Sequence, residues 1–341
     1  MDVETLTSSI NTAATTSQND MSEAQRQDLL AACKKLQSTL ETPREKTMDI
    51  LTTPYIAIGL RLGVDMLLFD REGESTVEEL AAQTGAESLL VKRTLRLLTA
   101  ASFFAESSSD PVTYKPTPLA RNYASSSPFA AAIIHSKKVT SQMVPLTALP
   151  TYLSENAFKC PEDAYNGAFQ YARGTPLHAF DWLATQPKLQ AAFNTVMTMS
   201  RPQPFYTSTS FPVLSKLPVS DPSSICIVDI GGGVGHVLRG LKAAFPQLRG
   251  KMIVQDLPSV ISSIEPGSLP DGISAMGCDF FAAQPIHGAR AYYLRAVLHD
   301  WPDAQALDIL GHVTAAMDRD SLVLVNEGVM PERGGGGWGR R

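Results

Sequence analysis

The sequence contains few cysteines, and their spacing excludes the common cysteine-based sites. Four cysteines occur among the 341 residues, at Cys33, Cys160, Cys226 and Cys278. They form no CxxC pair and have no ladder of nearby histidines, so neither a zinc site nor a disulfide framework is expected. The spacing therefore predicts reduced thiols and no metal site.

Long apolar runs and a secretory leader are also lacking. No run of about 18 uninterrupted apolar residues occurs, so no membrane-spanning helix is expected. The first residues are polar and carry no basic segment followed by an apolar one, the pattern of a signal peptide. We therefore expect a cytoplasmic protein without a membrane partner.

An excess of positive charge is absent as well. Lys and Arg number 29 and Asp and Glu number 34, which gives a formal net charge of -5. Because nucleic-acid-binding domains usually carry a basic surface, this balance predicts no nucleic-acid partner. An apolar fraction of 44% and a charged fraction of 18% indicate a globular chain rather than a disordered one. The length predicts about two domains.

Residues 21–125 have the element order of a winged helix. A helix begins near Ser75, with acidic residues in its first turn, and Gly85 ends it. A second helix follows over residues 88–100, and strand-like runs on either side of the polar turn 107–111 predict a hairpin. Helix, turn, helix and hairpin together predict a winged-helix-like domain.

The rest of the chain divides by changes in composition. Residues 1–20 are rich in Ser, Thr and Asn and predict a flexible N-terminus. Residues 126–220 are helical in pattern, rich in Met and aromatic residues, and end in a proline-punctuated linker. Residues 221–333 alternate strand-like and helical patterns, and residues 334–341 form a glycine-rich tail.

Residues 221–333 predict an α/β domain. Short apolar runs predict parallel strands that are buried on both faces, with helices at 237–245 and 303–317 among them. The predicted strands are 225–230, 251–255, 272–276, 289–294 and 321–326. Five strands that alternate with helices predict a Rossmann-like, doubly wound sheet, preceded by the mainly helical winged-helix domain.

A glycine-rich turn follows the first predicted strand of this sheet. Gly231, Gly233 and Gly235 have GxGxG spacing, directly after Asp229. Glycines let the backbone turn sharply and approach a ligand closely, while the next helix presents free N–H groups. A nicotinamide-binding GxGxxG loop would have its third glycine at position 236, which is His236. Alone, the motif is also compatible with a tight turn that binds no ligand.

Two further acidic turns follow the second and third predicted strands. Asp256, followed by Leu257, ends the second strand at a distance from the glycines that suits hydrogen bonds to a ribose diol. Asp279, followed by Phe280 and Phe281, suits the amino group and the face of an adenine ring. Asp256 could equally cap the next helix, and the second motif could be an ordinary turn with two core phenylalanines.

A histidine and a glutamate end the fourth and fifth strands. His299 follows the fourth strand and Glu327 follows the fifth, and ligands bind at this edge of an open α/β sheet. Neutral imidazole accepts a proton near neutral pH, and a carboxylate on its other nitrogen fixes the tautomer. The two side chains therefore predict a general base with an orienting carboxylate, although a single loop histidine is often structural.

Taken in order, four motifs resemble those of a known family. DIGGGVGHVL, IVQDLPSVI, GCDFF and LRAVLHDWPDAQALDIL resemble the class I O-methyltransferases that use S-adenosylmethionine, specifically the plant caffeate-type and fungal polyketide-type group of secondary metabolism. The resemblance covers nearly the whole chain, because that group also has an N-terminal winged-helix dimerisation domain and a helical substrate-binding segment. It implies a homodimer formed through the N-terminal domain.

The resemblance also implies residue roles. The glycines would contact the methionine part of S-adenosylmethionine, Asp256 the ribose, and Asp279 with Phe280 the adenine, while Arg295 is the basic residue near the cofactor. His299 would be the general base, with Glu327 as its orienting carboxylate. The complete predicted cofactor-binding set is Asp229, Gly231, Gly233, Gly235, Asp256, Leu257, Asp279, Phe280 and Arg295.

The resemblance implies a phenolic or polyketide-type aromatic substrate. Methylation of a phenol needs positioning for in-line attack and one base, without a metal. Flat apolar side chains and adaptable methionines suit a planar substrate. The predicted substrate contacts are Met143, Phe169, Trp182, Phe193 and Met197.

Three other functions remain open at this point. A winged helix can read DNA, and Lys92, Arg93 and Arg96 lie on its second predicted helix, although such a group is usually a solvated face. A nicotinamide oxidoreductase fits the glycine spacing less well. A truncated, weak or inactive methyltransferase is the third, because the family continues past the fifth strand to a seven-stranded sheet. We therefore expect an incomplete sheet of about five strands, with the shortfall after Glu332.

Overall fold

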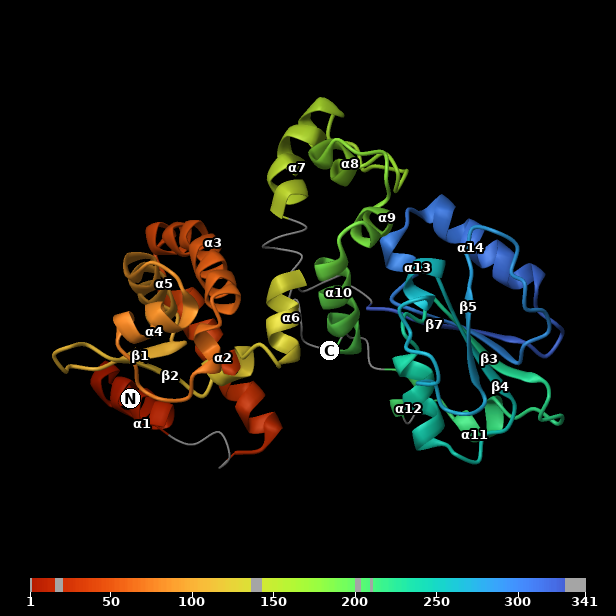
Figure 1. Cartoon of the computed structure of the whole chain (residues 1–341), viewed down its shortest axis with the longest axis horizontal. Coiled ribbons are helices and arrows are strands. Elements are labelled where there is room, and N and C mark those ends of the chain that lie inside the picture. The colour runs from red at the N-terminus through yellow and green to blue at the C-terminus, as the bar shows by residue number, and fades with distance from the viewer. Residues whose placement is uncertain (1, 16–20, 136–142, 200–203, 209–210, 329–341) are drawn as a thin grey trace. The chain divides into compact units, whose positions relative to one another are not determined.

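The structure is a computed structural model, drawn in Figure 1. The residues that it describes are 2–15, 21–135, 143–199, 204–208 and 211–328. The chain divides into two compact units, Met1–Ala57 and Ile58–Arg341. Within the described residues, no helix is long and apolar enough to cross a membrane.

The first unit consists of helices. α1 spans Val3–Thr15 and α2 spans Glu23–Leu40. α2 begins in a capping box, in which Ser22 and Gln25 each accept the other's backbone N–H through a side-chain oxygen. α1 lies within the segment for which a flexible N-terminus is predicted. Threonine and serine hydroxyls in this segment hydrogen-bond to helix carbonyls one turn earlier, so the polar composition is accommodated by a helix.

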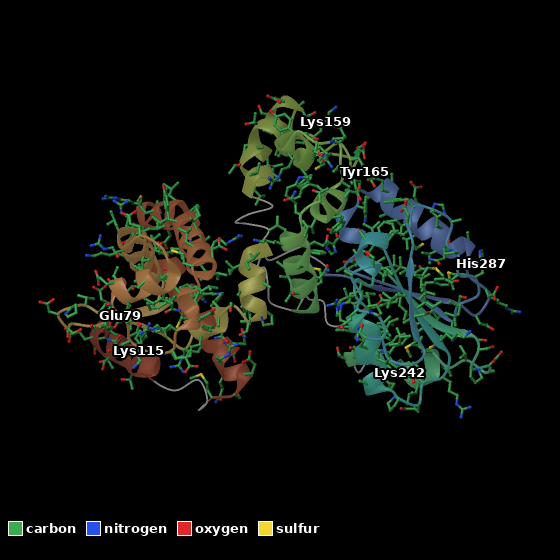
Figure 2. The ribbon with its side chains drawn as sticks, in the orientation of Figure 1. Glu79, Lys115, Lys159, Tyr165, Lys242 and His287 are labelled. Carbon is green, nitrogen blue, oxygen red and sulfur yellow. The ribbon has the colours of Figure 1, made fainter. Side chains whose placement is uncertain are left out.

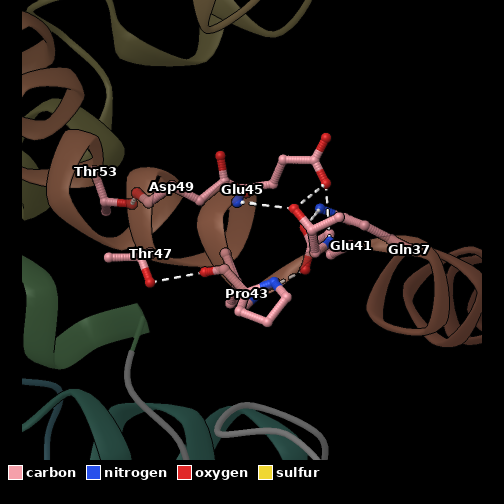
Figure 3. Close-up of polar contacts among 9 residues, drawn as sticks. Gln37, Glu41, Pro43, Glu45, Thr47, Asp49 and Thr53 are labelled. Carbon is pink, nitrogen blue, oxygen red and sulfur yellow. Dashed lines mark hydrogen bonds and ion pairs between the residues drawn. The ribbon is translucent and has the colours of Figure 1, made fainter.

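α3 spans Pro43–Asp65, and its first turn explains why the chain re-enters a helix at a proline. The N–H of Thr42 donates to Glu45 Oε2 at 2.9 Å, and the N–H of Glu45 donates to Thr42 Oγ1 at 3.3 Å. The Thr47 hydroxyl donates to the carbonyl of Pro43 at 2.8 Å (Figure 3). Pro43 occupies the first helical position, where a missing N–H leaves no bond unmade.

The second unit begins with the end of α3 and the predicted winged-helix elements. These are α4 (Val77–Thr84), α5 (Ser88–Ala100), β1 (Phe104–Glu106) and β2 (Tyr114–Pro116). Thr76 caps α4, and Gly85 ends it in the left-handed conformation with φ 68°. β1 and β2 pair antiparallel, with Ala105 opposite Lys115. The predicted order of helix, helix and hairpin is confirmed.

Short helices follow in the segment that we expected to be helical. They are α6 (Pro128–His135), α7 (Met143–Glu155), α8 (Ala168–Arg173), α9 (Ala179–Ala184), α10 (Pro187–Met199) and α11 (Val213–Lys216). α9 has an unusual N-terminal cap, because the ring of His178 accepts the backbone N–H of Phe180. α8 ends at Gly174, again in the left-handed conformation, with φ 59°.

A five-stranded parallel sheet forms the remainder of the unit. Its strands are β3 (Ile225–Ile230), β4 (Lys251–Asp256), β5 (Ile273–Gly277), β6 (Ala291–Arg295) and β7 (Leu322–Asn326). The helices between and after them are α12 (His236–Ala244), α13 (Pro258–Ile261) and α14 (Asp303–Ala315). The strand order β5-β4-β3-β6-β7 reverses direction between β3 and β6, so the ligand-binding edge is expected beside β3.

Both faces of this sheet are covered by apolar packing. Successive residues alternate between two buried clusters, with Ile227 in one and Val228 in the other. α12 contributes Leu241 to the first cluster, and α14 contributes Ile309 to the second. The helices therefore lie on opposite faces of the sheet (Figure 1), and the predicted Rossmann-like, doubly wound sheet is confirmed.

Candidate active site

A cavity opens where the carboxyl ends of the parallel strands meet. Its volume is about 520 Å³, within the range typical of small-molecule sites. The strand ends contribute Asp229, Asp256 and Arg295 to its wall, and the following loops contribute Asp279 and His299. The edge of the sheet that the strand order indicates is therefore where the predicted residues gather.

The glycine turn after β3 forms part of the cavity wall. Gly231 has φ 69°, and a Cβ placed there would lie 2.8 Å from Val297 Cγ2. Gly233 has φ 59° and faces open space, while its N–H donates to Asp256 Oδ2 at 2.8 Å. Close approach of a ligand to the backbone is therefore possible at Gly233.

Gly235 was expected to contact the cofactor, but it is not among the residues that line the cavity. It precedes α12 with φ 81°, and a Cβ there would lie 3.0 Å from Val254 Cγ2. Its lack of a side chain allows α12 to pack closely on β4. Gly235 thus serves the packing of the turn rather than contact with a ligand.

Asp256 joins the end of β4 to the glycine turn. Its Oδ2 accepts the N–H of Gly233, and its Oδ1 accepts the N–H of Leu257, both at 2.8 Å. Burial raises the pKa of Asp256, while the two backbone donors oppose this shift. Leu257 also lines the cavity. The structure thus places this acidic residue at the cavity and uses it to fix the turn.

Asp229 is a buried carboxyl group whose oxygen Oδ2 has no hydrogen-bond partner within the described part of the chain. Burial, with repulsion from Asp256 and against the attraction to Arg295, raises the pKa of Asp229 to about 8. Buried polar atoms in proteins are normally hydrogen-bonded, so this oxygen at the cavity wall lacks a donor that a ligand could supply. A cationic donor such as the ammonium group of an amino-acid ligand fits this position.

Arg295 and His236 lie side by side on the wall. Arg295 Nη1 is 3.4 Å from His236 Nε2. Burial and the neighbouring guanidinium of Arg295 together lower the pKa of His236 to about 4. His236 is therefore neutral at physiological pH and leaves Arg295 as a positive charge at this end of the cavity. A carboxylate ligand group would be attracted here.

His299 and Glu327 come together as predicted, because β6 and β7 are neighbours in the sheet. His299 Nδ1 lies 2.6 Å from Glu327 Oε2. Glu327 Oε1 accepts the backbone N–H groups of Val297 and Leu298, each at 2.9 Å, so the carboxylate is fixed in place. His299 Nε2 lies 3.5 Å from Asp300 Oδ1. In the neutral ring, donation from Nδ1 to this carboxylate leaves the lone pair on Nε2, which is the form that accepts a proton.

The predicted adenine-binding residues lie in an aromatic cluster around Trp301. The rings of Phe280 and Trp301 meet edge to face at 5.6 Å, and those of Phe281 and Trp301 at 4.7 Å. Asp279 is exposed, lines the cavity, and accepts the N–H of Phe281 at 2.9 Å. The motif is thus both an ordinary turn and part of the wall.

The predicted substrate contacts are brought together only in part. Phe193 and Met197 on α10 line the cavity. Phe169 and Trp182 do not, because their rings pack on each other at 5.8 Å with Arg173 over the indole at 4.4 Å. The Met143 side chain lies outside the described residues.

Several wall residues were missed by sequence reasoning. His178 and Asp181 flank the start of α9, and Tyr165, labelled in Figure 2, lies in the loop before α8. None stands in a recognisable motif, since each meets the site through packing of distant segments. His178 directly precedes α9, a position typical of a helix cap rather than of a ligand contact. Within the described residues, no group of three or more His, Cys, Asp or Glu that could hold a metal occurs.

Comparison with known proteins identifies two matching families. Residues 155–337 match the O-methyltransferase domain, and residues 55–126 match the O-methyltransferase dimerisation domain. The first match covers more than half of the chain. The second covers the two helices and the hairpin of the predicted winged helix, and its family describes them as a dimerisation domain.

Individual relatives agree with these matches. O-methyltransferase lepI of Aspergillus flavus is 35% identical over 317 residues, which are 91% of this chain and 80% of that protein. Demethylsterigmatocystin 6-O-methyltransferase of Aspergillus parasiticus is 33% identical over 278 residues, 81% of this chain and 69% of that protein. The structure of LepI in complex with S-adenosylmethionine has a TM-score of 0.82 and 32% identity, and the match covers 97% of this chain and 84% of that one.

These relatives confirm the expected cofactor class and fold. The glycine turn, the unpartnered Asp229 oxygen and the charge of Arg295 fit the amino-acid part of S-adenosylmethionine. The chain therefore belongs to the S-adenosylmethionine-dependent O-methyltransferases and carries the dimerisation domain of that family.

Proposed function

We propose that this protein methylates a hydroxyl group of an aromatic, phenolic or polyketide-type small molecule, with His299 as the general base. The observation that carries the proposal is the 2.6 Å contact between His299 Nδ1 and Glu327 Oε2 at the cavity wall. Glu327 holds the imidazole with its lone pair on Nε2, ready to take the hydroxyl proton. The apolar side chains of Phe193 and Met197 provide flat contacts for an aromatic ring.

The cofactor would be held by residues that already point at the cavity. Asp229 would bind the ammonium of its amino-acid part, Arg295 the carboxylate, Asp256 the ribose, and Asp279 with Phe280 the adenine. When bound, S-adenosylmethionine supplies an activated methyl group, whose bond to sulfur breaks as the bond to oxygen forms. His299 Nε2 takes the proton that leaves the hydroxyl, and Glu327 stabilises the resulting imidazolium.

We also propose that the chain acts as a homodimer. The match of residues 55–126 to the dimerisation domain supports this. Several apolar side chains of the helices before it are exposed in the single chain, including Ile50 at 63% and Leu51 at 58%. Light scattering coupled to gel filtration should give twice the chain mass, and a monomeric mass across the working concentrations would overturn this proposal.

The reaction is tested by methyl transfer to a panel of phenols. We expect transfer by the wild type and a loss of about a hundredfold or more in kcat for His299→Ala, which is the usual contribution of a general base. His287→Ala serves as the control, because His287 is exposed and does not line the cavity. Binding of S-adenosylhomocysteine should be unchanged in both variants.

Two results would contradict the proposal. Full activity of His299→Ala would remove the base assignment. A wild-type protein that binds S-adenosylhomocysteine but methylates no phenol would remove the substrate class and favour a catalytically inactive relative.

A further inference from the structure

Another histidine, His178, lines the cavity and has no part in the reaction described above. We propose that its Nε2–H group donates a hydrogen bond to a carbonyl oxygen of the substrate that is conjugated with the hydroxyl to be methylated. The inference rests on the proposed function and narrows its substrate class. The preferred substrates are hydroxylated aromatic carbonyl compounds rather than simple phenols.

The tautomer of His178 is fixed by the start of α9. The backbone N–H of Phe180 donates to His178 Nδ1 at 3.3 Å, so Nδ1 carries the lone pair. A neutral imidazole with an accepting Nδ1 must carry its hydrogen on Nε2. Burial lowers the pKa of His178, and attraction to Asp181 does not overcome this, so the ring is neutral at physiological pH. His178 is therefore a donor at Nε2.

Aromatic packing holds this donor rigidly. The His178 ring is stacked on Trp301, with centroids 4.4 Å apart and planes at 16°. The rings of Tyr165 and Phe180 each lie 5.3 Å away. The residue is only 7% exposed, yet it lines the cavity. With one face covered and Nδ1 engaged, the Nε2 edge is what remains to meet a ligand.

No described residue satisfies this edge. Within the described chain, Nε2 of His178 has no hydrogen-bond partner, whereas its Nδ1 has one. A rigid polar group at a cavity wall favours a ligand that supplies the missing acceptor. Because the group donates, the ligand atom must be an acceptor oxygen or nitrogen.

His178 and His299, two of the histidines that line the cavity, are held in opposite tautomers. Nδ1 of His299 donates to the Glu327 carboxylate, so its Nε2 can take a proton. Nδ1 of His178 instead accepts the N–H of Phe180, so its Nε2 carries the hydrogen. Trp301 follows His299 by two residues and stacks on His178, so one loop positions both rings. The site can thus remove a proton at one point and donate a hydrogen bond at another.

This pairing suits a hydroxyl that is conjugated with a carbonyl group. When the hydroxyl loses its proton, conjugation moves part of the negative charge to the carbonyl oxygen. A preorganised donor at that oxygen stabilises the charge as it develops, and its effect is larger in a site shielded from water. In the free substrate, the hydroxyl can donate a hydrogen bond to this carbonyl. A hydrogen bond from His178 to the carbonyl would replace that internal bond, and the released hydroxyl is then easier to deprotonate.

The cap role of His178 must be separated from the proposed recognition role. His178→Asn keeps an oxygen near the position of Nδ1 and can still cap α9, but its side chain is too short to place a donor at Nε2. His178→Gln can place a donor at the position of Nε2, because its amide nitrogen reaches that far, but it is a poorer cap for α9. A purely structural histidine would be replaced better by Asn, which is a favoured cap residue, and a recognising histidine better by Gln.

The experiment uses two ring systems that differ in one carbonyl group, 1-hydroxyxanthone and 1-hydroxyxanthene. Values of kcat/KM are measured for wild type, His178→Asn, His178→Gln and the surface control His287→Asn. Binding of both compounds to the protein with S-adenosylhomocysteine is measured by calorimetry, so that recognition is tested even without turnover. Thermal melting and S-adenosylhomocysteine affinity monitor folding of each variant.

We expect wild type to favour the xanthone by about tenfold or more, as for a hydrogen bond to a developing charge. His178→Asn should lose this preference, His178→Gln should regain part of it, and His287→Asn should match wild type. Equal kcat/KM or equal affinity of wild type for the two compounds overturns the inference, as does a preference that survives in His178→Asn. Methylation of both compounds without preference refutes the inference alone, whereas methylation of no phenol refutes the proposed function.

Discussion

Nδ1 of His299 and Oε2 of Glu327 lie 2.6 Å apart although 28 residues separate them in the chain. The pairing of β6 with β7 produces this contact, because Arg295 stands opposite Asn326 at the ends of the two strands. Glu327 also holds the loop before His299 through the N–H groups of Val297 and Leu298. One carboxylate therefore fixes both the position of the loop and the tautomer of the ring.

These two roles of Glu327 can be separated by substitution. Glu327→Gln keeps an oxygen for the two backbone N–H groups but removes the charge beside the imidazole. We expect kcat to fall by about tenfold to a hundredfold with little change in melting temperature. Glu327→Ala should lower both, because two part-buried N–H groups lose their acceptor.

The control for these variants is Glu265→Gln, an exposed glutamate after α13 that does not line the cavity. Methyl-transfer rates and thermal melts are recorded for all three proteins. Wild-type kcat in Glu327→Gln would show that the charge is not needed to orient His299.

The buried carboxyl of Asp229 predicts a pH dependence of stability without cofactor. Its pKa is raised to about 8 from an ordinary value of 3.8, so between these values the folded protein holds a proton that the unfolded chain releases. The contribution of Asp229 to the free energy of unfolding is therefore greatest below about pH 4 and is lost as the pH rises toward 8. Asp229→Asn removes this contribution and should flatten the decline.

Urea unfolding of the cofactor-free protein at pH 5, 6.5 and 8 measures the effect. Asp229→Asn should gain stability relative to wild type as the pH rises through this range. Parallel pH profiles for the two proteins would contradict the assignment. The same variant should bind S-adenosylhomocysteine more weakly, because the charge for the ammonium group is missing.

The glycine turn predicts two contrasting alanine variants. Gly235→Ala places a Cβ 3.0 Å from Val254 Cγ2 at a positive φ, so it should lower the free energy of unfolding by about 2 kcal/mol. Gly233→Ala meets no atom within 4 Å and should cost only the strain of its φ, about 1 kcal/mol. Its methyl group would instead obstruct the ligand.

Urea unfolding and calorimetry with S-adenosylhomocysteine separate the two effects. We expect Gly233→Ala to show the greater loss of affinity and Gly235→Ala the greater loss of stability. The opposite ranking would place Gly235 at the ligand after all.

A buried amide pair beneath the site predicts a non-additive effect on stability. Gln255 and Gln284 each donate to the other's side-chain oxygen at 2.8 Å, and both are at most 5% exposed. Gln284→Ala leaves the amide of Gln255 without this partner and should cost about 2 kcal/mol or more. The double variant Gln255→Met with Gln284→Met removes both amides at similar volume and should be more stable than either single Met variant.

Urea unfolding gives the free energy of unfolding of each variant, and Gln247→Ala at an exposed position is the control. Additive losses in the double variant would show that the two amides do not depend on each other.

The sequence predicted the framework of the site well because that framework rests on local patterns. Apolar runs marked the strands, and ligands meet a parallel sheet at its carboxyl edge, so Asp256 and His299 could be placed from spacing, whereas Arg295 was placed through the family resemblance. Spacing did not predict which side chains of the short helix α9 face the cavity. Phe180 and Asp181 on α9 line the cavity, whereas Trp182, the next residue, packs against Phe169 instead.

The sequence by itself thus determined the α/β sheet, the glycine turn and the pairing of a histidine with a glutamate, since each follows from short-range periodicity and from strand order. Only the tertiary structure decided that Gly235 serves packing and that His178 stacks on Trp301 across more than a hundred residues. The physical reason is that side-chain direction and tautomer depend on contacts between distant segments, which no local pattern encodes. The donor on His178 is a product of such contacts.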